Sequence, residues 1–205
     1  MPYQEGYIKY QCVWTPAPAP DTQWIQAVND WRTLFFQKNL IGYNETLEAG
    51  FGNISCRHPQ NPGMFIISAT QTGHIPILSP HHYTTVTQYN LEKNTLACSG
   101  PLKASSESLT HAATYLLSPE INCVIHIHHP QMWSHYLNHL PTTSPEATYG
   151  TPEMAFEVQR LWRETLLPEK RTFVMGGHVE GLVSFGKNPA EAAEILLFYY
   201  QALFT

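Results

Sequence analysis

The sequence has few charged residues and no long apolar run. Only 13% of its 205 residues are Asp, Glu, Lys or Arg, whereas 43% are hydrophobic and 12% are aromatic. This composition is the opposite of that of a disordered chain, and the length suits one globular domain with its own core. No window approaches the roughly 18 consecutive apolar residues of a membrane helix, and the first residues lack the pattern of a signal peptide. The sequence therefore predicts a cytoplasmic protein that does not associate with membranes.

Basic residues and cysteines are also scarce. Lys and Arg together number 11 against 16 Asp and Glu, which gives a net charge of -5 with the histidines neutral. Because such a chain offers no basic field to a polyanion, nucleic acid is not an expected partner. The four cysteines form no Cys-x-x-Cys pair and are too few for a disulfide framework. We expect them to be reduced thiols.

The order of the chain predicts a short arm followed by one layered domain. The stretch Thr15–Pro20 reads TPAPAP, which is stiff and extended. Residues 1–20 are therefore expected to form an N-terminal arm, laid on the body or on a neighbouring subunit, and residues 21–205 to form the domain.

Helices and strands are mixed along that domain. Asp21, Thr151 and Asn188 each precede apolar residues at helical spacing and can cap a helix, and Ser105 or Ser106 can cap another. Strands at this spacing between helices predict a layered α/β or α+β domain. The expected strands are short runs rich in apolar and β-branched residues: Met64–Ser68, Thr84–Val86, Cys123–His128, Thr172–Met175 and Gly181–Phe185.

Histidine is the residue in excess, with 11 copies, as many as Lys and Arg together. His126 and His128 lie on one predicted strand, and because side chains alternate they share a face at a Cα separation of about 7 Å. Both imidazoles can then reach one metal ion. Ile127 and His129 face the other way, so His129 is expected to be a packing residue or one that supports the ligands from behind. A hydrogen-bonded pair with no metal is the alternative interpretation of such a pattern.

Two further groups suit the same ion. Glu107 stands at the start of the helix before that strand, and His178 directly follows a predicted strand and two glycines. Three imidazoles and a carboxylate suit zinc or another divalent first-row metal, and three histidines with an open position are typical of a catalytic site. Ordinary stabilisation of a helix start by an acidic side chain is the alternative for Glu107.

The motifs that carry this pattern follow one another along most of the chain. They are Gly50-Phe51-Gly52-Asn53-Ile54-Ser55, Thr70-Gln71-Thr72-Gly73, Ser105-Ser106-Glu107, His126-Ile127-His128 and Gly177-His178 followed by Gly181-Leu182. In order and spacing they resemble the class II aldolase/adducin family, which includes fuculose-phosphate and rhamnulose-phosphate aldolases, ribulose-phosphate 4-epimerase and methylthioribulose-phosphate dehydratase. The resemblance covers roughly Trp24 to Phe198. One departure is the insertion of Val179-Glu180 between His178 and Gly181-Leu182.

The resemblance implies a fold and a set of site residues. The fold is a three-layer α/β/α sandwich with a mixed, largely antiparallel central sheet. A divalent metal, usually zinc, would be held by His126, His128 and His178, and Glu107 would serve as a fourth ligand or as the catalytic acid/base. By the same matching, the substrate's phosphate or other anion would be bound by Asn53, Thr72, Gly73, Ser105 and Ser106.

The function expected from this resemblance is that of a zinc-dependent lyase. It would cleave a C–C bond of a small hydroxylated carbonyl compound, such as a sugar phosphate, through a metal-stabilised enediolate. Dehydration, epimerisation or decarboxylation at the same metal site is one alternative, and a non-catalytic, adducin-like scaffold is another. The family also implies a homotetramer. The proton donor to the leaving group is left open among Tyr149, Glu153 and Glu180.

Overall fold

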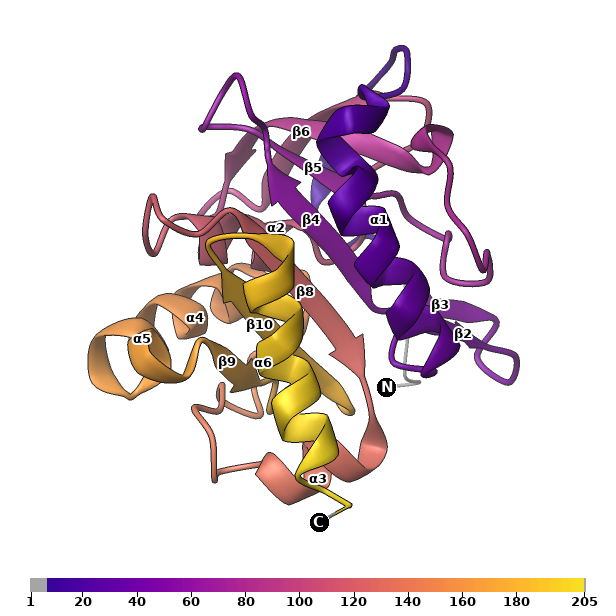
Figure 1. Cartoon of the computed structure of the whole chain (residues 1–205). Coiled ribbons are helices and arrows are strands. Elements are labelled where there is room, and N and C mark those ends of the chain that lie inside the picture. The colour runs from indigo at the N-terminus through magenta and orange to yellow at the C-terminus, as the bar shows by residue number, and fades with distance from the viewer. Residues whose placement is uncertain (1–6, 205) are drawn as a thin grey trace.

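The computed structural model describes residues 7–204, which form three layers (Figure 1). The middle layer of this part of the chain is an eight-stranded sheet in the order β1-β7-β6-β5-β4-β8-β10-β9. Adjacent strands are antiparallel except for the parallel pair β1 and β7, so the predicted α/β/α sandwich with a mixed, largely antiparallel sheet is confirmed. The strands are β1 (Gln11–Pro16), β4 (Asn53–Arg57), β5 (Phe65–Ser68), β6 (Tyr83–Asn90), β7 (Thr95–Gly100), β8 (Cys123–His128), β9 (Thr172–Val174) and β10 (Gly181–Gly186), with β2 (Gly42–Asn44) and β3 (Ala49–Phe51) in a separate hairpin.

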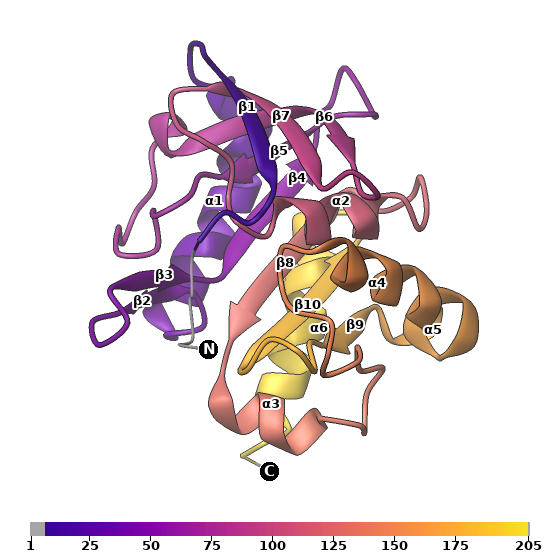
Figure 2. The same cartoon turned by 180° about the vertical axis from the view of Figure 1, so that it is seen from behind.

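Helices cover both faces of this sheet. On one face α1, α3 and α6 enclose a core with the sheet, and α1 and α6 lie in front of the strands in Figure 1. On the other face α2, α4 and α5 enclose a second core, as Figure 2 shows from behind. The helices are α1 (Thr22–Gln37), α2 (Ser108–Tyr115), α3 (Pro130–Tyr136), α4 (Pro152–Glu164), α5 (Leu167–Lys170) and α6 (Pro189–Gln201), with a short 3-10 helix η1 (Pro80–His82).

Strand β8 lies between β4 and β10, and all six of its residues are buried. Ile125 and Ile127 pack in the core beneath α1 and α6, whereas Val124 packs in the core beneath α2 and α4. Because side chains alternate along a strand, His126 and His128 share the face of Val124. The ladder with β10 includes both histidines, and the ladder with β4 begins at His126.

Three predicted helix starts are confirmed. The side chains of Asp21, Thr151 and Asn188 each accept a hydrogen bond from a backbone N–H in the first turn of α1, α4 and α6. Pro152 and Pro189 follow directly, at a position where a helix needs no N–H donor. Local sequence is sufficient at these three sites because the cap and the helix are neighbours in the chain.

The predicted cap at Ser105 or Ser106 is wrong. Helix α2 begins at Ser108, and Glu107 occupies the capping position without a side-chain capping bond. Ser105 contributes its carbonyl oxygen instead, which accepts from the backbone N–H of Ser108 at 3.0 Å and from the Ser108 hydroxyl at 2.7 Å. A turn therefore precedes the helix and carries Ser105, Ser106 and Glu107 together.

Part of the predicted arm belongs to the sheet. Gln11–Pro16 forms the edge strand β1 and pairs with β7, so this part of the segment lies on the body of the same chain. The prolines of this segment favour an extended backbone, and Pro16 ends an edge strand, where a missing N–H is tolerated. The hydroxyl of buried Tyr10 lies 3.1 Å and 2.9 Å from the carbonyl oxygens of Ala104 and Ser105, which fastens the segment beside the turn before α2. Residues 1–6 lie outside the described part of the chain.

The four cysteines are free thiols, as expected. The sulfur atoms of Cys12 and Cys98 lie 3.8 Å apart. None of the helices described has the length and apolar character needed to cross a bilayer.

Buried His111 predicts that stability falls in acid. Its Nδ1 lies 2.7 Å from the hydroxyl of Ser55, and burial lowers its pKa well below the ordinary value of 6.5. Below about pH 6.5 the unfolded chain takes up a proton at this position that the folded chain does not, so the free energy of unfolding decreases with falling pH. We expect the free energy of unfolding, measured by urea titration at several pH values between about 7 and 5, to fall less steeply with decreasing pH in His111→Gln than in the parent protein. Exposed His139→Gln should retain the parent's slope, and an unchanged slope in His111→Gln would contradict the prediction.

Candidate metal centre

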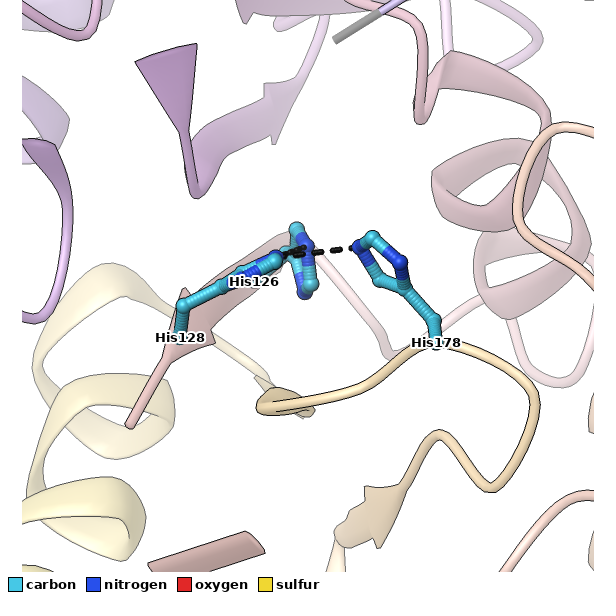
Figure 3. Close-up of side chains that lie close together, drawn as sticks. All are labelled: His126, His128 and His178. Carbon is cyan, nitrogen blue, oxygen red and sulfur yellow. Dashed lines mark hydrogen bonds between the residues drawn. The ribbon is translucent and has the colours of Figure 1, made fainter. Parts of the chain in front are cut away.

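Three histidines from two segments of the chain meet at one point (Figure 3). His126 and His128 extend from β8, and His178 reaches them from the turn between β9 and β10. The Nε2 atom of His128 lies 3.1 Å from Nε2 of His126 and 3.0 Å from Nε2 of His178. All three side chains are buried, and one nitrogen of each lies within 4.8 Å of the others. The predicted histidine set is therefore brought together in space.

The three imidazoles are neutral near pH 7. Burial lowers the pKa of His126 to about 4, and burial together with the neighbouring imidazoles lowers the pKa of His128 and His178 well below the ordinary value. The Nδ1 atom of His126 lies 3.1 Å from the carbonyl oxygen of Leu182, to which it donates as N–H. This tautomer leaves the lone pair of Nε2 directed toward the other two imidazoles.

The cluster fits a divalent first-row metal ion. Zinc binds histidine nitrogen at about 2.0–2.1 Å in tetrahedral geometry, which places two ligand nitrogens roughly 3.3 Å apart. The Nε2 separations of 3.0 Å and 3.1 Å are close to this value. Because Nε2 of His126 is bare, a neutral ring N–H at Nε2 of His128 can serve only one of the two short contacts that this nitrogen makes, and the lowered pKa values disfavour a second proton on any of the three rings. A metal ion bound between the three Nε2 atoms would accept all of their lone pairs.

Glu107 adds a carboxylate to the cluster. Its side chain is 3% exposed, and its Oε1 lies 3.5 Å from Nε2 of His178. The hydroxyl of Thr110 donates to Oε2 at 2.7 Å, which orients the carboxylate. A buried carboxylate held beside three histidines can complete a metal site or exchange a proton with a bound molecule.

A cavity of about 190 Å³ opens beside the cluster. Glu107 and His126 form part of its wall, so the cavity reaches the metal centre. No Lys or Arg is among the lining residues described. The remaining predicted site residues all line the same cavity: Asn53, Thr72, Gly73, Ser105 and Ser106.

The polar groups of this wall differ in whether they have a hydrogen-bond donor or acceptor available for a ligand. The Thr72 hydroxyl donates to the carbonyl oxygen of Ala69 at 2.8 Å, so its hydrogen is already used. Asn53 lies opposite His126 in the ladder of β4 and β8, and its buried Oδ1 has no hydrogen-bond partner among residues 7–204. Buried polar atoms are rarely left unpaired, so this amide indicates a missing ligand. Gly73 is required by packing, because a Cβ atom there would lie 2.1 Å from the carbonyl oxygen of Gly42.

Gly181 keeps space for two of the histidine rings, which gives a testable prediction. A Cβ atom on this residue would lie 2.8 Å from Cδ2 of His178 and 3.2 Å from Cε1 of His126. Gly181→Ala should therefore displace both rings and weaken zinc binding by about 10–100-fold, comparable to loss of an outer-shell contact. Competition with a chromogenic chelator measures this. Gly63→Ala, in an exposed turn, is the matched control and should bind zinc like the parent, and undiminished affinity in Gly181→Ala would refute the prediction.

The inserted Val179-Glu180 pair forms the tip of a tight turn. The backbone N–H of Gly181 donates to the carbonyl oxygen of His178 at 3.0 Å, and Glu180 adopts a left-handed backbone with φ of 69°. The insertion therefore leaves His178 at the cluster. Glu180 is not among the residues that line the cavity.

The other two candidate proton donors lie at different distances from the site. The ring centroid of buried Tyr149 lies 4.7 Å from that of His178, and the Lys9 ammonium lies 3.7 Å from the Tyr149 ring centroid. Glu153, in the first turn of α4, is exposed and is absent from the cavity lining. Tyr149 is thus the candidate that adjoins the metal cluster.

Sequence reasoning missed several residues of the site. Thr110 follows Glu107 by one helical turn, and that spacing is a signal that could have revealed it. Tyr7 lines the cavity from the N-terminal segment, which the resemblance does not include. No local signal in the sequence indicates its position, because it depends on how β1 joins the sheet.

The described part of the chain therefore combines a three-layer sandwich with three histidines and a carboxylate beside a polar cavity, which together form a candidate metal site. The model of the family described as class II aldolase and adducin N-terminal domain matches residues 38–203. The chain therefore belongs to the class II aldolase/adducin family, and the predicted resemblance is confirmed.

Solved structures show the same fold at low sequence identity. L-fuculose 1-phosphate aldolase is 14% identical with a TM-score of 0.63, over 90% of this chain and 86% of that one. A sugar-phosphate aldolase from Thermotoga maritima is 18% identical with a TM-score of 0.63, over 88% and 91%. YgbL from Klebsiella pneumoniae, for which aldolase, epimerase or decarboxylase activity has been suggested, is 19% identical with a TM-score of 0.64, over 89% of each chain. A comparison with curated proteins finds no match.

Proposed function

We propose that this protein is a metal-dependent lyase that cleaves a C–C bond of a small hydroxylated carbonyl compound, such as a sugar phosphate. The observation that carries the proposal is the buried Glu107 carboxylate, which lies 3.5 Å from a metal-site histidine and also lines the cavity. Similarity in fold to two sugar-phosphate aldolases supports the same reaction class.

His126, His128 and His178 would hold the metal, with zinc as the proposed ion and Glu107 as a further ligand before substrate binds. When bound, a divalent metal polarises a carbonyl group and stabilises the negative charge that develops on its oxygen. Glu107 would hold or move the proton at the carbon next to that carbonyl. This role suits a carboxylate that is shielded from water and oriented by Thr110.

The polar wall of the cavity would bind the anionic end of the substrate. Asn53, Ser105 and Ser106 would donate hydrogen bonds, and Thr72 and Gly73 would contribute backbone groups. Hydroxyls, amides and backbone N–H groups bind phosphate without the help of a lysine. The unpaired Asn53 oxygen is an acceptor and calls for a donor, such as a hydroxyl of the substrate, while the N–H groups of the same amide would donate to the anion.

The test is to incubate the zinc-loaded protein with a panel of ketose phosphates and to analyse the products. Release of an aldehyde supports the aldolase reaction, whereas a dehydrated, epimerised or decarboxylated product would assign one of the alternative reactions to the same site. Metal analysis of the purified protein tests the adducin-like scaffold, which needs no stoichiometric zinc. A protein with neither zinc nor turnover would overturn the proposal.

We also propose that the protein assembles as a homo-oligomer, a tetramer by analogy with its family. Large apolar side chains on and after α6 are open to solvent in the single chain, with Phe198 and Phe204 each 65% exposed. Aromatic residues of this kind are favoured at subunit interfaces. Light scattering coupled to size-exclusion chromatography would measure the mass, and a monomer would contradict this part of the proposal.

A further inference from the structure

Arg32 of α1 is buried behind one wall of the cavity, although no sequence motif marks it. Its side chain is 1% exposed, and its guanidinium donates to four carbonyl oxygens of the loop that follows β5. The Nη2 atom lies 3.0 Å from the oxygen of Thr72 and 3.2 Å from that of Gly73, and Nη1 donates to Ile75 and to Pro76. These loop residues do not pair with any strand, so the hydrogen bonds from Arg32 hold the backbone of the loop in place.

These bonds determine which way the loop's amides face. In a trans peptide the carbonyl and the N–H of the same unit point in opposite directions. Because the carbonyls of Thr72 and Gly73 point at Arg32, the N–H groups of Gly73 and His74 point away from it. Within residues 7–204 neither N–H has a hydrogen-bond acceptor, although Gly73 is buried and lines the cavity. A buried donor without a partner indicates a ligand that supplies the acceptor.

Arg32 also brings a positive charge close to this wall. No carboxylate lies within ion-pair distance of its guanidinium in the described part of the chain, so its partners are carbonyl dipoles alone. Burial lowers its pKa to about 10, which leaves it protonated at neutral pH. Since the cavity lining contains Glu48 and Glu107 and no Lys or Arg, this charge favours an anion where the unpaired amides are.

We propose that Arg32 is a positioning residue for the anionic group of the substrate: it orients the Thr72–Gly73 backbone toward a phosphate and supplies the positive charge behind it. This inference rests on the proposed function of the cavity. It goes beyond the family match, which begins at residue 38 and does not include Arg32.

The chain offers a matched control in Arg57. This arginine also donates to four carbonyl oxygens, of Ile121, Pro62, Tyr115 and Ser118, at 2.7–3.2 Å. Neither Arg57 nor any of these four partners is among the residues that line the cavity. Arg32→Met and Arg57→Met each remove a guanidinium bound to four carbonyls, so a purely structural role predicts similar effects for both.

The experiment is calorimetric titration of the zinc-loaded protein with inorganic phosphate, with acetate as a second probe that separates a tetrahedral phosphate from a carboxylate. Arg32→Met should weaken phosphate binding by roughly tenfold or more, as loss of a charge-assisted interaction predicts, with zinc stoichiometry unchanged. Arg32→Lys keeps the charge and should restore part of the affinity, and it serves as the second variant if Arg32→Met does not fold. Arg57→Met should bind phosphate like the parent.

Three results would overturn the proposal: phosphate affinity unchanged in Arg32→Met, an equal loss in Arg57→Met, or no phosphate binding by the parent protein. Preference for acetate over phosphate would overturn the assignment to a phosphate. Failure of the lyase proposal is distinguishable, because it would appear as absence of turnover by a zinc-loaded protein whose phosphate binding still depends on Arg32.

Discussion

His128→Ala is expected to lose bound metal and turnover together. Its Nε2 lies 3.1 Å from that of His126 and 3.0 Å from that of His178, so it is the central member of the cluster. Without it the central ligand is missing, and only two imidazoles and the Glu107 carboxylate remain to hold the ion. The loss of zinc affinity should exceed the roughly 10–100-fold that removal of an outer-shell partner costs. Metal analysis after dialysis, together with kcat on the substrate found by the panel, measures both effects.

His129→Ala is the matched control for this variant. His129 is the next residue in the chain but faces away from the cluster: its Nδ1 accepts from the backbone N–H of Met132 at the start of α3, and its ring packs on Tyr200. Loss of this cap should lower the free energy of unfolding by about 1 kcal/mol and leave zinc stoichiometry intact. Stoichiometric zinc in purified His128→Ala, or equal loss of zinc in His129→Ala, would show that the cluster is not the metal site.

Glu107→Gln is expected to keep the metal and lose turnover. Glutamine has nearly the same shape, and its amide oxygen can still accept from the Thr110 hydroxyl, which donates to Oε2 of Glu107 at 2.7 Å. The three histidines remain to hold zinc. What is lost is the group that exchanges a proton, and removal of a general acid/base lowers kcat by about 10²–10⁴-fold. Steady-state kinetics and metal analysis on the same preparation separate the two effects.

Glu153→Gln provides the comparison for Glu107→Gln. Glu153 is exposed in the first turn of α4, so the same change of chemistry there should leave kcat within about twofold of the parent, as surface substitutions usually do. Undiminished kcat in Glu107→Gln would exclude a proton-transfer role for Glu107. Loss of zinc from that variant would instead identify Glu107 as an indispensable ligand and refute the expectation stated above.

The parts of the fold that depend on neighbouring residues could be predicted from the sequence. The strand Cys123–His128 has the expected bounds, and alternation along it correctly separates His126 and His128 from Ile127. The caps at Asp21, Thr151 and Asn188 are likewise local, because each side chain bonds an N–H two or three residues away. Local patterns failed at Ser105, where the carbonyl of a preceding turn replaces a side-chain cap.

Parts of the site that depend on contacts between distant segments could not be derived from spacing. The approach of His178 to His128 spans 50 residues; the two glycines before His178 suggested it and the family resemblance supported it, but spacing alone could not establish it. The contact of Arg32 with Thr72 spans 40 residues and left no pattern in the sequence. The pairing of Gln11–Pro16 could not be derived for the same reason, because its partner is the distant strand β7. In each case tertiary pairing, rather than propensity, decides the position.

A crystal structure of the zinc-loaded protein with anomalous data on both sides of the zinc absorption edge tests the central claim most directly. The account predicts one strong anomalous peak, within coordination distance of Nε2 of His126, His128 and His178 and next to the carboxylate of Glu107. No peak at this point, or a zinc ion bound elsewhere on the chain while these imidazoles bond only to one another, would contradict it.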